Sequence, residues 1–168
     1  KNHQAALNYL FSNVSKRIDE NLILKLHSIL MNGIRDDAGE YRMHGVRIVG
    51  ANVPTANFLK VPDLMKQLVT DINKKTRDSI HQIASMHSIF EKIHPFSDGN
   101  GRIGRLIMQA MSLKKNLPPI IVEQDKKQLY YIYLQKAQLH NDTSLLEDFI
   151  GDAMLKGLAI LKRAKSAQ

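Results

Sequence analysis

The sequence contains no cysteine in its 168 residues. Disulfide bonds and thiolate metal sites are therefore excluded, and a reducing compartment such as the cytoplasm is favoured. No apolar stretch approaches the roughly 20 residues that cross a bilayer, and the N-terminus lacks the basic, apolar and small-residue order of a signal peptide. We therefore expect a cytoplasmic chain without a membrane partner.

Several catalytic motifs are missing as well. No Gly-x-x-x-x-Gly-Lys-Ser/Thr sequence is present, which excludes a P-loop. The histidines show no metal-ligand spacing and no His-Glu-x-x-His, which argues against a zinc enzyme. His87 shares an apolar helical stripe with Ile83 and Phe90, so we interpret it as a buried, hydrogen-bonded histidine.

Positive charge is in excess. The formal net charge of +8 suits an anionic partner, which could be nucleic acid, an acidic protein surface or a nucleotide triphosphate. Hydrophobic residues make up 43% of the chain, enough for one domain with a single core. The chain opens at Lys1 without a methionine, and we expect it to be a fragment of a longer protein whose regulatory segments lie outside it.

Helical periodicity covers most of the sequence. The predicted helices are Ala5–Phe11, Asn21–Ile34, Leu64–Ile72, Ile80–Ile93, Leu106–Leu113, Leu129–Ala137 and Leu145–Leu161. Ser144 and Glu147 form a capping-box pattern at the start of the last helix. Only Val46–Gly50 and Asn57–Val61 resemble the extended arms of a small hairpin. The sequence therefore predicts an all-α protein with one small β-hairpin.

The segment from His94 to Arg105, HPFSDGNGRIGR, predicts a corner between two helices. Proline and glycine break the first helix, and a second helix starts at about Arg102. Gly99 and Gly101 allow backbone amides to turn inward, and the second helix adds its own N-terminal amides. Such a surface binds phosphate oxygens.

Side chains at this corner suggest chemistry. Arg102 and Arg105 are three residues apart and can grip a polyphosphate together. Asp98 offers the single carboxylate that suits Mg²⁺, which takes waters and phosphate oxygens as its other ligands. His94 can accept a proton from an attacking hydroxyl at neutral pH. Phe96 is expected to point into the core and to anchor the loop.

These residues resemble the signature of the Fic family, His-x-Phe-x-Asp/Glu-Gly-Asn-Gly-Arg-x-x-Arg, with every specified position filled. The likeness extends to Gly39-Glu-Tyr-Arg42, to Val61-Pro-Asp-Leu-Met65 and to Tyr130-Tyr131, so it covers most of the chain. It implies a single Fic domain over residues 1–168, with a helical core and a β-hairpin flap. It also implies transfer of AMP from Mg-ATP to a Ser, Thr or Tyr hydroxyl of a target protein, with release of pyrophosphate.

The resemblance implies a role at each matching position. His94 would be the general base and Asp98 the Mg²⁺ ligand. ATP and its phosphates would contact Gly99, Asn100, Gly101, Arg102, Arg105, Tyr130, Tyr131 and Gln138, the last standing where many relatives have asparagine. The flap would align a target strand by backbone pairing. Its residues are Val53, Pro54, Thr55, Ala56, Asn57 and Phe58.

Relatives are often restrained by a Ser/Thr-x-x-x-Glu-Gly/Asn helix whose glutamate pairs with the second motif arginine, here Arg105. The near match from Thr143 to Glu147 is followed by Asp148, and the capping box already accounts for it. We therefore expect the inhibitory helix in cis, N-terminal to Lys1; the alternatives are a partner chain, such as an antitoxin, and a protein that has no inhibitory glutamate. The oligomeric state is open.

Four other functions compete with AMP transfer. Gly99 to Gly104 also fits Gly-x-Gly-x-x-Gly, but a dinucleotide site needs a buried strand where Pro-Phe-Ser-Asp stands. Transfer of UMP or GMP instead of AMP remains open, whereas phosphorylation is disfavoured because kinase-like relatives resembling Doc carry lysine at Gly101. The positive charge leaves a non-catalytic nucleic-acid-binding module as the rival from another class.

Overall fold

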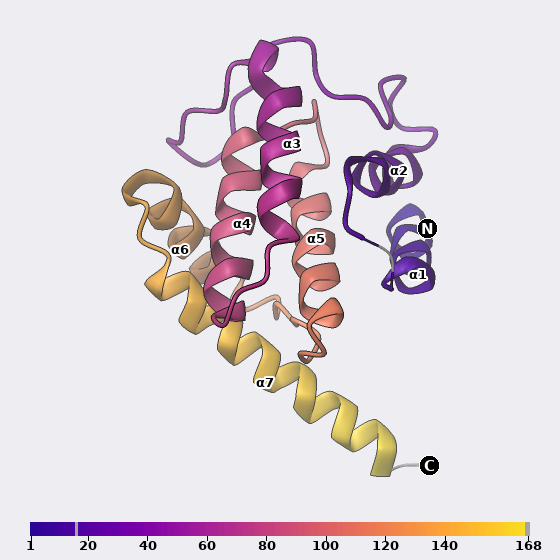
Figure 1. Ribbon diagram of the computed structural model, residues 1–168, viewed down its shortest axis with the longest axis vertical. Helices are drawn as coiled ribbons and strands as arrows, with labels where there is room; N and C mark the ends of the chain where they lie inside the picture. Colours follow the sequence, from indigo (N-terminus) through magenta and orange to yellow (C-terminus); the bar gives the residue numbers. More distant parts are fainter. Residues whose placement is uncertain (16, 167–168) are drawn as a thin grey trace.

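Seven α-helices and one short 3-10 helix account for most of residues 1–15 and 17–166, the part of the chain described by the computed structural model (Figure 1). The all-α prediction is confirmed, and each predicted helix overlaps an observed one. The elements are α1 (Asn2–Asn13), α2 (Glu20–Met31), η1 (Phe58–Lys60), α3 (Val61–Ile72), α4 (Ser79–Ile93), α5 (Asn100–Lys114), α6 (Lys127–His140) and α7 (Ser144–Ser166).

Helix starts follow local capping chemistry. Asp19 accepts from the Leu22 amide at 2.8 Å to open α2, and Asp78 accepts from the His81 amide at 2.9 Å to open α4. The capping box predicted at Ser144 is not formed. Asp142 accepts from both the amide and the hydroxyl of Ser144, while the Thr143 hydroxyl pairs with Glu147, so an acidic side chain upstream caps α7 instead.

Helix α4 lies at the centre of the bundle. It packs against α3, α5, α6 and α7, while α1 and α2 pack on each other and contact α5 (Figure 1). The core side chains come from these facing surfaces and include Phe90 of α4 and Phe96 of the loop after it, both fully buried. Helix α4 is thus covered on several sides. The loop between its end at Ile93 and the start of α5 at Asn100 is the corner predicted from the sequence.

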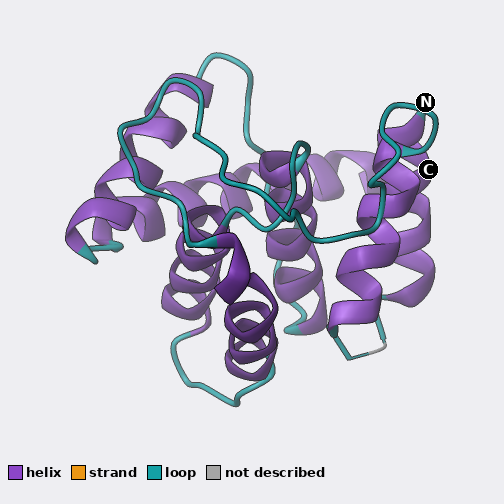
Figure 2. Cartoon of the chain, turned by 90° about the horizontal axis from the view of Figure 1, so that it is seen from above, coloured by secondary structure: helices purple, strands orange, loops and turns teal. Residues whose placement is uncertain are grey.

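The predicted β-hairpin is not formed. No residue in the described part of the chain is in a strand, and the chain between α2 and η1 crosses the helix ends as a long loop (Figure 2). Thr55 Oγ1 donates to the Val46 carbonyl at 2.9 Å, but the carbonyls of His44 and Ala56 accept from Arg42 instead of from a facing strand. Asn57 caps η1 and Pro62 sits in the first turn of α3, so the second arm is helical.

None of the helices within residues 1–15 and 17–166 combines the length and the apolar character needed to cross a bilayer.

Candidate functional site

The motif forms a tight turn between α4 and α5. His94 is the C-cap of α4 in left-handed conformation, with φ 52°, and its amide donates to the Phe90 carbonyl at 2.9 Å. Gly99, with φ 81°, is the N-cap of α5, a backbone conformation that favours glycine. Helix α5 begins at Asn100, slightly before the predicted start at Arg102. The N-terminal amides of α5 thus open onto the turn.

A recess of about 300 Å³ lies at this turn. Most of the motif residues predicted to act in catalysis or phosphate binding line it, together with one residue of α6: His94, Asp98, Gly99, Asn100, Gly101, Arg102, Arg105 and Tyr131. Its remaining wall includes Arg47, Ile48 and Val49 from the long loop. Three arginines and the N-terminus of α5 face one carboxylate here, so the recess is suited to an anionic ligand.

Phe96 holds the motif loop in the core. The side chain is fully buried, and its ring stacks flat on His27, with centroids 3.8 Å apart and an interplanar angle of 6°. The Asn100 side chain braces the same loop, accepting from the Phe96 amide at 2.9 Å and donating to the Phe96 carbonyl at 2.8 Å. Because both polar atoms of this side chain are engaged, only the backbone amide of Asn100 is available to a ligand.

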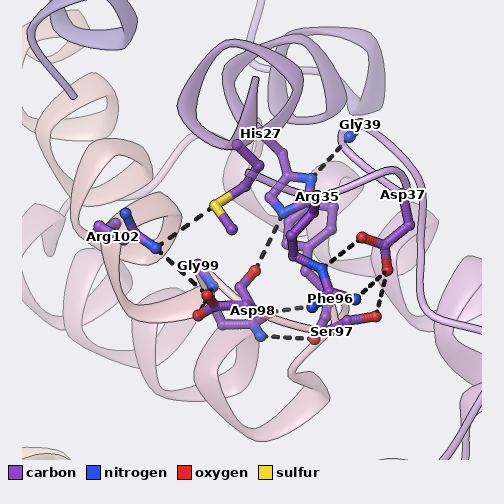
Figure 3. Close-up of polar contacts among 11 residues, drawn as sticks. His27, Arg35, Asp37, Gly39, Phe96, Ser97, Asp98, Gly99 and Arg102 are labelled. Carbon is purple, nitrogen blue, oxygen red and sulfur yellow. Dashed lines mark hydrogen bonds and ion pairs between the residues drawn. The ribbon is translucent and has the colours of Figure 1, made fainter. Parts of the chain in front are cut away.

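Asp98 is the exposed carboxylate of the recess, with a side-chain exposure of 60%. Its Oδ1 accepts from the Gly99 amide, and its Oδ2 lies 3.8 Å from Arg102 Nη2 (Figure 3). The carboxylate thus occupies the position where an anionic ligand would meet the loop amide. A single exposed carboxylate beside arginines fits Mg²⁺ that arrives with a polyphosphate. In residues 1–15 and 17–166, no group of three or more His, Cys, Asp and Glu side chains gathers into a larger metal site.

The imidazole of His94 is held in one tautomer. Its Nδ1 lies 3.1 Å from the Glu91 carbonyl oxygen, which can only accept, so Nδ1 carries the proton. Neutral imidazole then has its free lone pair on Nε2. Burial, aided by the nearby charge of Arg42, lowers the pKa of His94 against smaller opposing effects of the Glu91 carbonyl and Asp98. The ring is therefore neutral at pH 7 and can accept a proton.

Tyr130 lies outside the recess. It is buried on α6, and its hydroxyl is 2.6 Å from His87 Nε2. Burial, together with the charge of Glu91, raises the pKa of Tyr130. The Arg105 guanidinium opposes this shift through its charge and a hydrogen bond to the hydroxyl, so the two side chains are neighbours. Tyr130 and Arg105 also line a second cavity of about 520 Å³ together with His3, Leu7 and Phe11 of α1.

Gln138 is also away from the recess. The residue is 4% exposed, and its carbonyl accepts from Lys92 Nζ at 3.1 Å. Its Nε2 is buried and has no hydrogen-bond partner among the described residues. The structure thus brings Tyr131, but not Gln138 or Tyr130, to the recess.

The proposed flap residues, numbers 53–58, belong to the long loop and to the start of η1, and none of them lines the recess. Val53 is buried. The backbone of Ala56 is engaged, since its amide donates to the Lys92 carbonyl at 3.2 Å and its carbonyl accepts from Arg42 Nη2 at 2.6 Å. The loop residue most open to solvent at the recess is Val49, which is 99% exposed and was not predicted.

Three functional candidates escaped the sequence analysis. Arg42, named there only as a landmark, is 2% exposed and binds the backbone carbonyls of Ile93, His94, His44 and Ala56. His27 was noted only as lacking metal spacing, yet it contacts the motif loop directly. Glu91 had been assigned no role. Its predictive signal was only its place in the helix before the motif.

Glu91 is buried where α4 and α5 meet. Its Oε1 has no hydrogen-bond partner in the described structure, and burial raises the pKa of Glu91 to about 7, although Arg105 opposes the shift. Neighbouring His87 was predicted to be buried and hydrogen-bonded, and both are confirmed. Burial, with the charge of Arg105, lowers the pKa of His87 to about 3. Both side chains are therefore predominantly neutral in the core between about pH 3 and pH 7.

Comparison with known proteins agrees with this geometry. A family model described as Fic/DOC family matches residues 17–112. "Protein adenylyltransferase Fic" of Drosophila virilis is 29% identical over 167 residues, which cover 96% of this chain and 34% of the fly protein. The chain thus spans about a third of that relative's length.

Solved structures share the fold. Fic-1 from C. elegans, residues 134–508, superposes with a TM-score of 0.85 at 25% identity, covering 99% of this chain and 51% of the nematode chain. The BepC protein of Bartonella tribocorum, solved with bound AMPPNP, superposes with a TM-score of 0.72 at 19% identity, covering 89% of this chain and 80% of BepC.

Proposed function

The chain belongs to the Fic/DOC family, and we propose on that basis that it is a protein adenylyltransferase that transfers AMP from ATP to a Ser, Thr or Tyr hydroxyl of a target protein. The observation that carries the proposal is the recess itself, where a histidine with a free Nε2 lone pair stands beside an anion-binding turn and two arginines. The name of the Drosophila relative and the nucleotide bound in BepC support the same reading.

His94 is proposed as the general base. The target hydroxyl oxygen attacks the α-phosphorus of ATP and forms a new O–P bond, while the bond between the α-phosphorus and the bridging oxygen of pyrophosphate breaks. The hydroxyl proton passes to His94 Nε2, and the Glu91 carbonyl keeps Nδ1–H oriented during the transfer. Proton acceptance of this kind typically contributes about 10²–10⁴-fold to the rate.

The turn and the arginines are proposed to bind the phosphates. The Gly99 amide and the first amides of α5, at Asn100 and Gly101, face the developing negative charge, and Arg102 and Arg105 bind the phosphate oxygens. A phosphate oxygen would replace the Asp98 carboxylate at the Gly99 amide. Asp98 would then be free to hold Mg²⁺, which when bound neutralises charge on the phosphates.

Tyr131 is proposed to contact the nucleoside directly, because it is half exposed at the recess. Tyr130 and Gln138 are buried, so we propose that they act from beneath, Tyr130 by supporting Arg105 and Gln138 by fixing α6 on Lys92. The loop segment 53–58 is proposed to align the target strand, with Arg47 to Val49 forming the edge that the target meets first.

An inhibitory glutamate on Arg105 is proposed as the regulator. The second cavity joins α1 to Arg105, and the pKa of His3 is lowered by burial and then by the charges of Arg105 and Arg102. Residues that precede Lys1 would therefore emerge close to both arginines. We propose that a helix in cis enters here, with an antitoxin chain in trans as the alternative. Residues 1–168 are proposed as one Fic domain of a longer, cytoplasmic protein.

The test is incubation of the protein with labelled ATP and a lysate, followed by mass spectrometry of the modified target. We expect an AMP adduct, whereas a UMP or GMP adduct after incubation with UTP or GTP would redirect the specificity. His94→Ala should still bind ATP but lose nearly all transfer, and His140→Ala, a change at an exposed histidine, should leave transfer intact. Undiminished transfer by His94→Ala would overturn the assignment of the base.

A further inference from the structure

His27 of α2 contacts the motif loop at Asp98 and at Phe96 and lies beside Gly99. It is 1% exposed and lies 71 residues before Asp98 in sequence, yet its Nε2 is 3.1 Å from the Asp98 carbonyl oxygen. Its ring stacks on Phe96, and a Cβ placed on Gly99 would lie 3.6 Å from its Cδ2. On the opposite side, the Gly39 amide donates to its Nδ1 at 2.9 Å (Figure 3).

The two hydrogen bonds define the protonation of the ring. The Gly39 amide can only donate, so Nδ1 must carry a lone pair, and the Asp98 carbonyl can only accept, so Nε2 must carry the proton. One neutral tautomer satisfies both partners. Burial lowers the pKa of His27 and so favours the neutral form, although the Asp98 carbonyl and the charges of Asp37 and Asp98 oppose the shift.

The contact with Asp98 determines which way the next amide points. In a trans peptide the carbonyl and the amide hydrogen lie on opposite sides of the plane. Because the Asp98 carbonyl is held toward α2, the Gly99 amide faces away from α2, where it donates to the Asp98 carboxylate at the recess.

We propose that His27 is a positioning residue of the nucleotide site, which fixes the peptide between Asp98 and Gly99 so that the Gly99 amide is presented to a phosphate oxygen. The inference rests on the proposed function, because it assigns that amide to ATP. Packing alone does not require a histidine at this position, since a phenyl ring could stack on Phe96 equally well.

The test compares His27→Phe, which keeps the stacked ring but loses both hydrogen bonds, with His27→Gln, which keeps an amide donor and an acceptor. Binding of ATP and of adenosine is measured by calorimetry, with His140→Phe at an exposed position as control. His27→Phe should weaken ATP binding about tenfold, as expected for one charge-assisted hydrogen bond, and leave adenosine binding unchanged. His27→Gln should recover part of the ATP affinity.

Two results would overturn the inference: unchanged ATP affinity in His27→Phe, or an equal loss of ATP and adenosine affinity. If His27→Phe does not fold, ¹⁵N NMR of the unmodified protein decides. ATP should shift the Gly99 amide and His27 Nε2 resonances, adenosine should shift neither, and the absence of an ATP-induced shift would contradict the proposal. Wild-type protein that fails to bind ATP at all would instead refute the proposed function.

Discussion

Arg42 Nε donates a 2.7 Å hydrogen bond to the carbonyl oxygen of His94. The same guanidinium donates to the carbonyls of Ile93, at the end of α4, and of His44 and Ala56, in the long loop. One buried side chain therefore joins the helix end, the proposed base and the loop that walls the recess. It also places positive charge at the C-terminus of α4, where the helix dipole favours it.

Arg42→Lys should loosen this junction although it preserves the charge. A lysine ammonium cannot reach the same four carbonyls with a planar fork, so buried acceptors lose their partners. We expect a loss of roughly 2–4 kcal/mol in the free energy of unfolding, measured in urea. Faster proteolysis between residues 43 and 57 should accompany it. Arg163→Lys, on the exposed end of α7, is the control. Equal stability of the two variants would contradict this role of Arg42.

The pH profile of transfer should report His94. Because its pKa is lowered from 6.5, the ring remains in the neutral, proton-accepting form as the pH falls to that value. The rate constant kcat should be level around pH 7 and should fall, approaching tenfold per pH unit, only below the lowered pKa. Residual transfer by His94→Ala should lack this limb. A wild-type rate that already declines as the pH drops from 8 to 7 would argue against this assignment.

Gly104→Ala should destabilise the protein in spite of the higher helix propensity of alanine. A Cβ at this position would overlap Glu91 Oε1 and lie 3.0 Å from His87 Cε1, so these buried side chains of α4 would have to shift. The gain of about 1 kcal/mol in propensity is smaller than the roughly 1–3 kcal/mol or more that such overpacking costs. The midpoint of thermal unfolding should fall.

Gly151→Ala is the matched control for that substitution. It also lies within a helix, α7, but a Cβ there meets nothing within 4 Å. It should raise the free energy of unfolding by about 0.5–1 kcal/mol. If both alanine variants changed stability in the same direction, steric contact at Gly104 would not be the cause.

Glu91→Gln should change how stability depends on pH. The pKa of Glu91 rises from 4.5 to about 7 on folding, so its contribution to stability is full below pH 4.5 and is lost as the pH rises through 7. At 1.36 kcal/mol per pKa unit, the loss is about 3 kcal/mol. Wild-type protein should therefore lose this amount relative to Glu91→Gln between pH 4.5 and pH 8.

His87 contributes in the opposite direction, because its lowered pKa stabilises the folded state above pH 6.5 and this stabilisation is lost as the pH falls toward 3. The contribution is present in wild type and in Glu91→Gln alike, so it cancels in the difference between them. Urea unfolding at several pH values measures the difference. Glu40→Gln, which makes the same change at an exposed carboxylate, is the control. A pH-independent difference for Glu91→Gln would show that folding does not raise the pKa of the Glu91 carboxyl group.

The structural features that could be predicted are those that depend on residues close together in the sequence. Helical periodicity and the glycines of the motif depend on neighbouring residues, so the helices and the turn at His94 to Gly99 follow from short windows. The hairpin prediction was wrong because Arg42 donates hydrogen bonds to backbone carbonyls that would have paired with a neighbouring strand. No local pattern in the sequence predicts that Arg42 is buried. The contact of His27 with Asp98 also depends on the packing of α2 against α5.

The side of a helix that a residue occupies was harder to predict where two faces are partly apolar. Tyr130 and Tyr131 are adjacent, but Tyr130 points to His87 in the core while Tyr131 reaches the recess. Gln138 is buried as well, eight residues after Tyr130 and seven residues after Tyr131. At 3.6 residues per turn, seven residues are about two turns, so spacing within α6 places Gln138 near the face of Tyr131 and does not predict that it is away from the recess.

Every hydrogen bond that the Arg42 side chain makes in the described structure is to a backbone carbonyl. Because any amino acid supplies a carbonyl, substitutions between residues 44 and 56 can accumulate while the path of the loop is retained. Exposed side chains of this loop can therefore change without moving the His94 carbonyl that Arg42 holds, which makes the recess wall a part of the molecule that sequence variation can reshape.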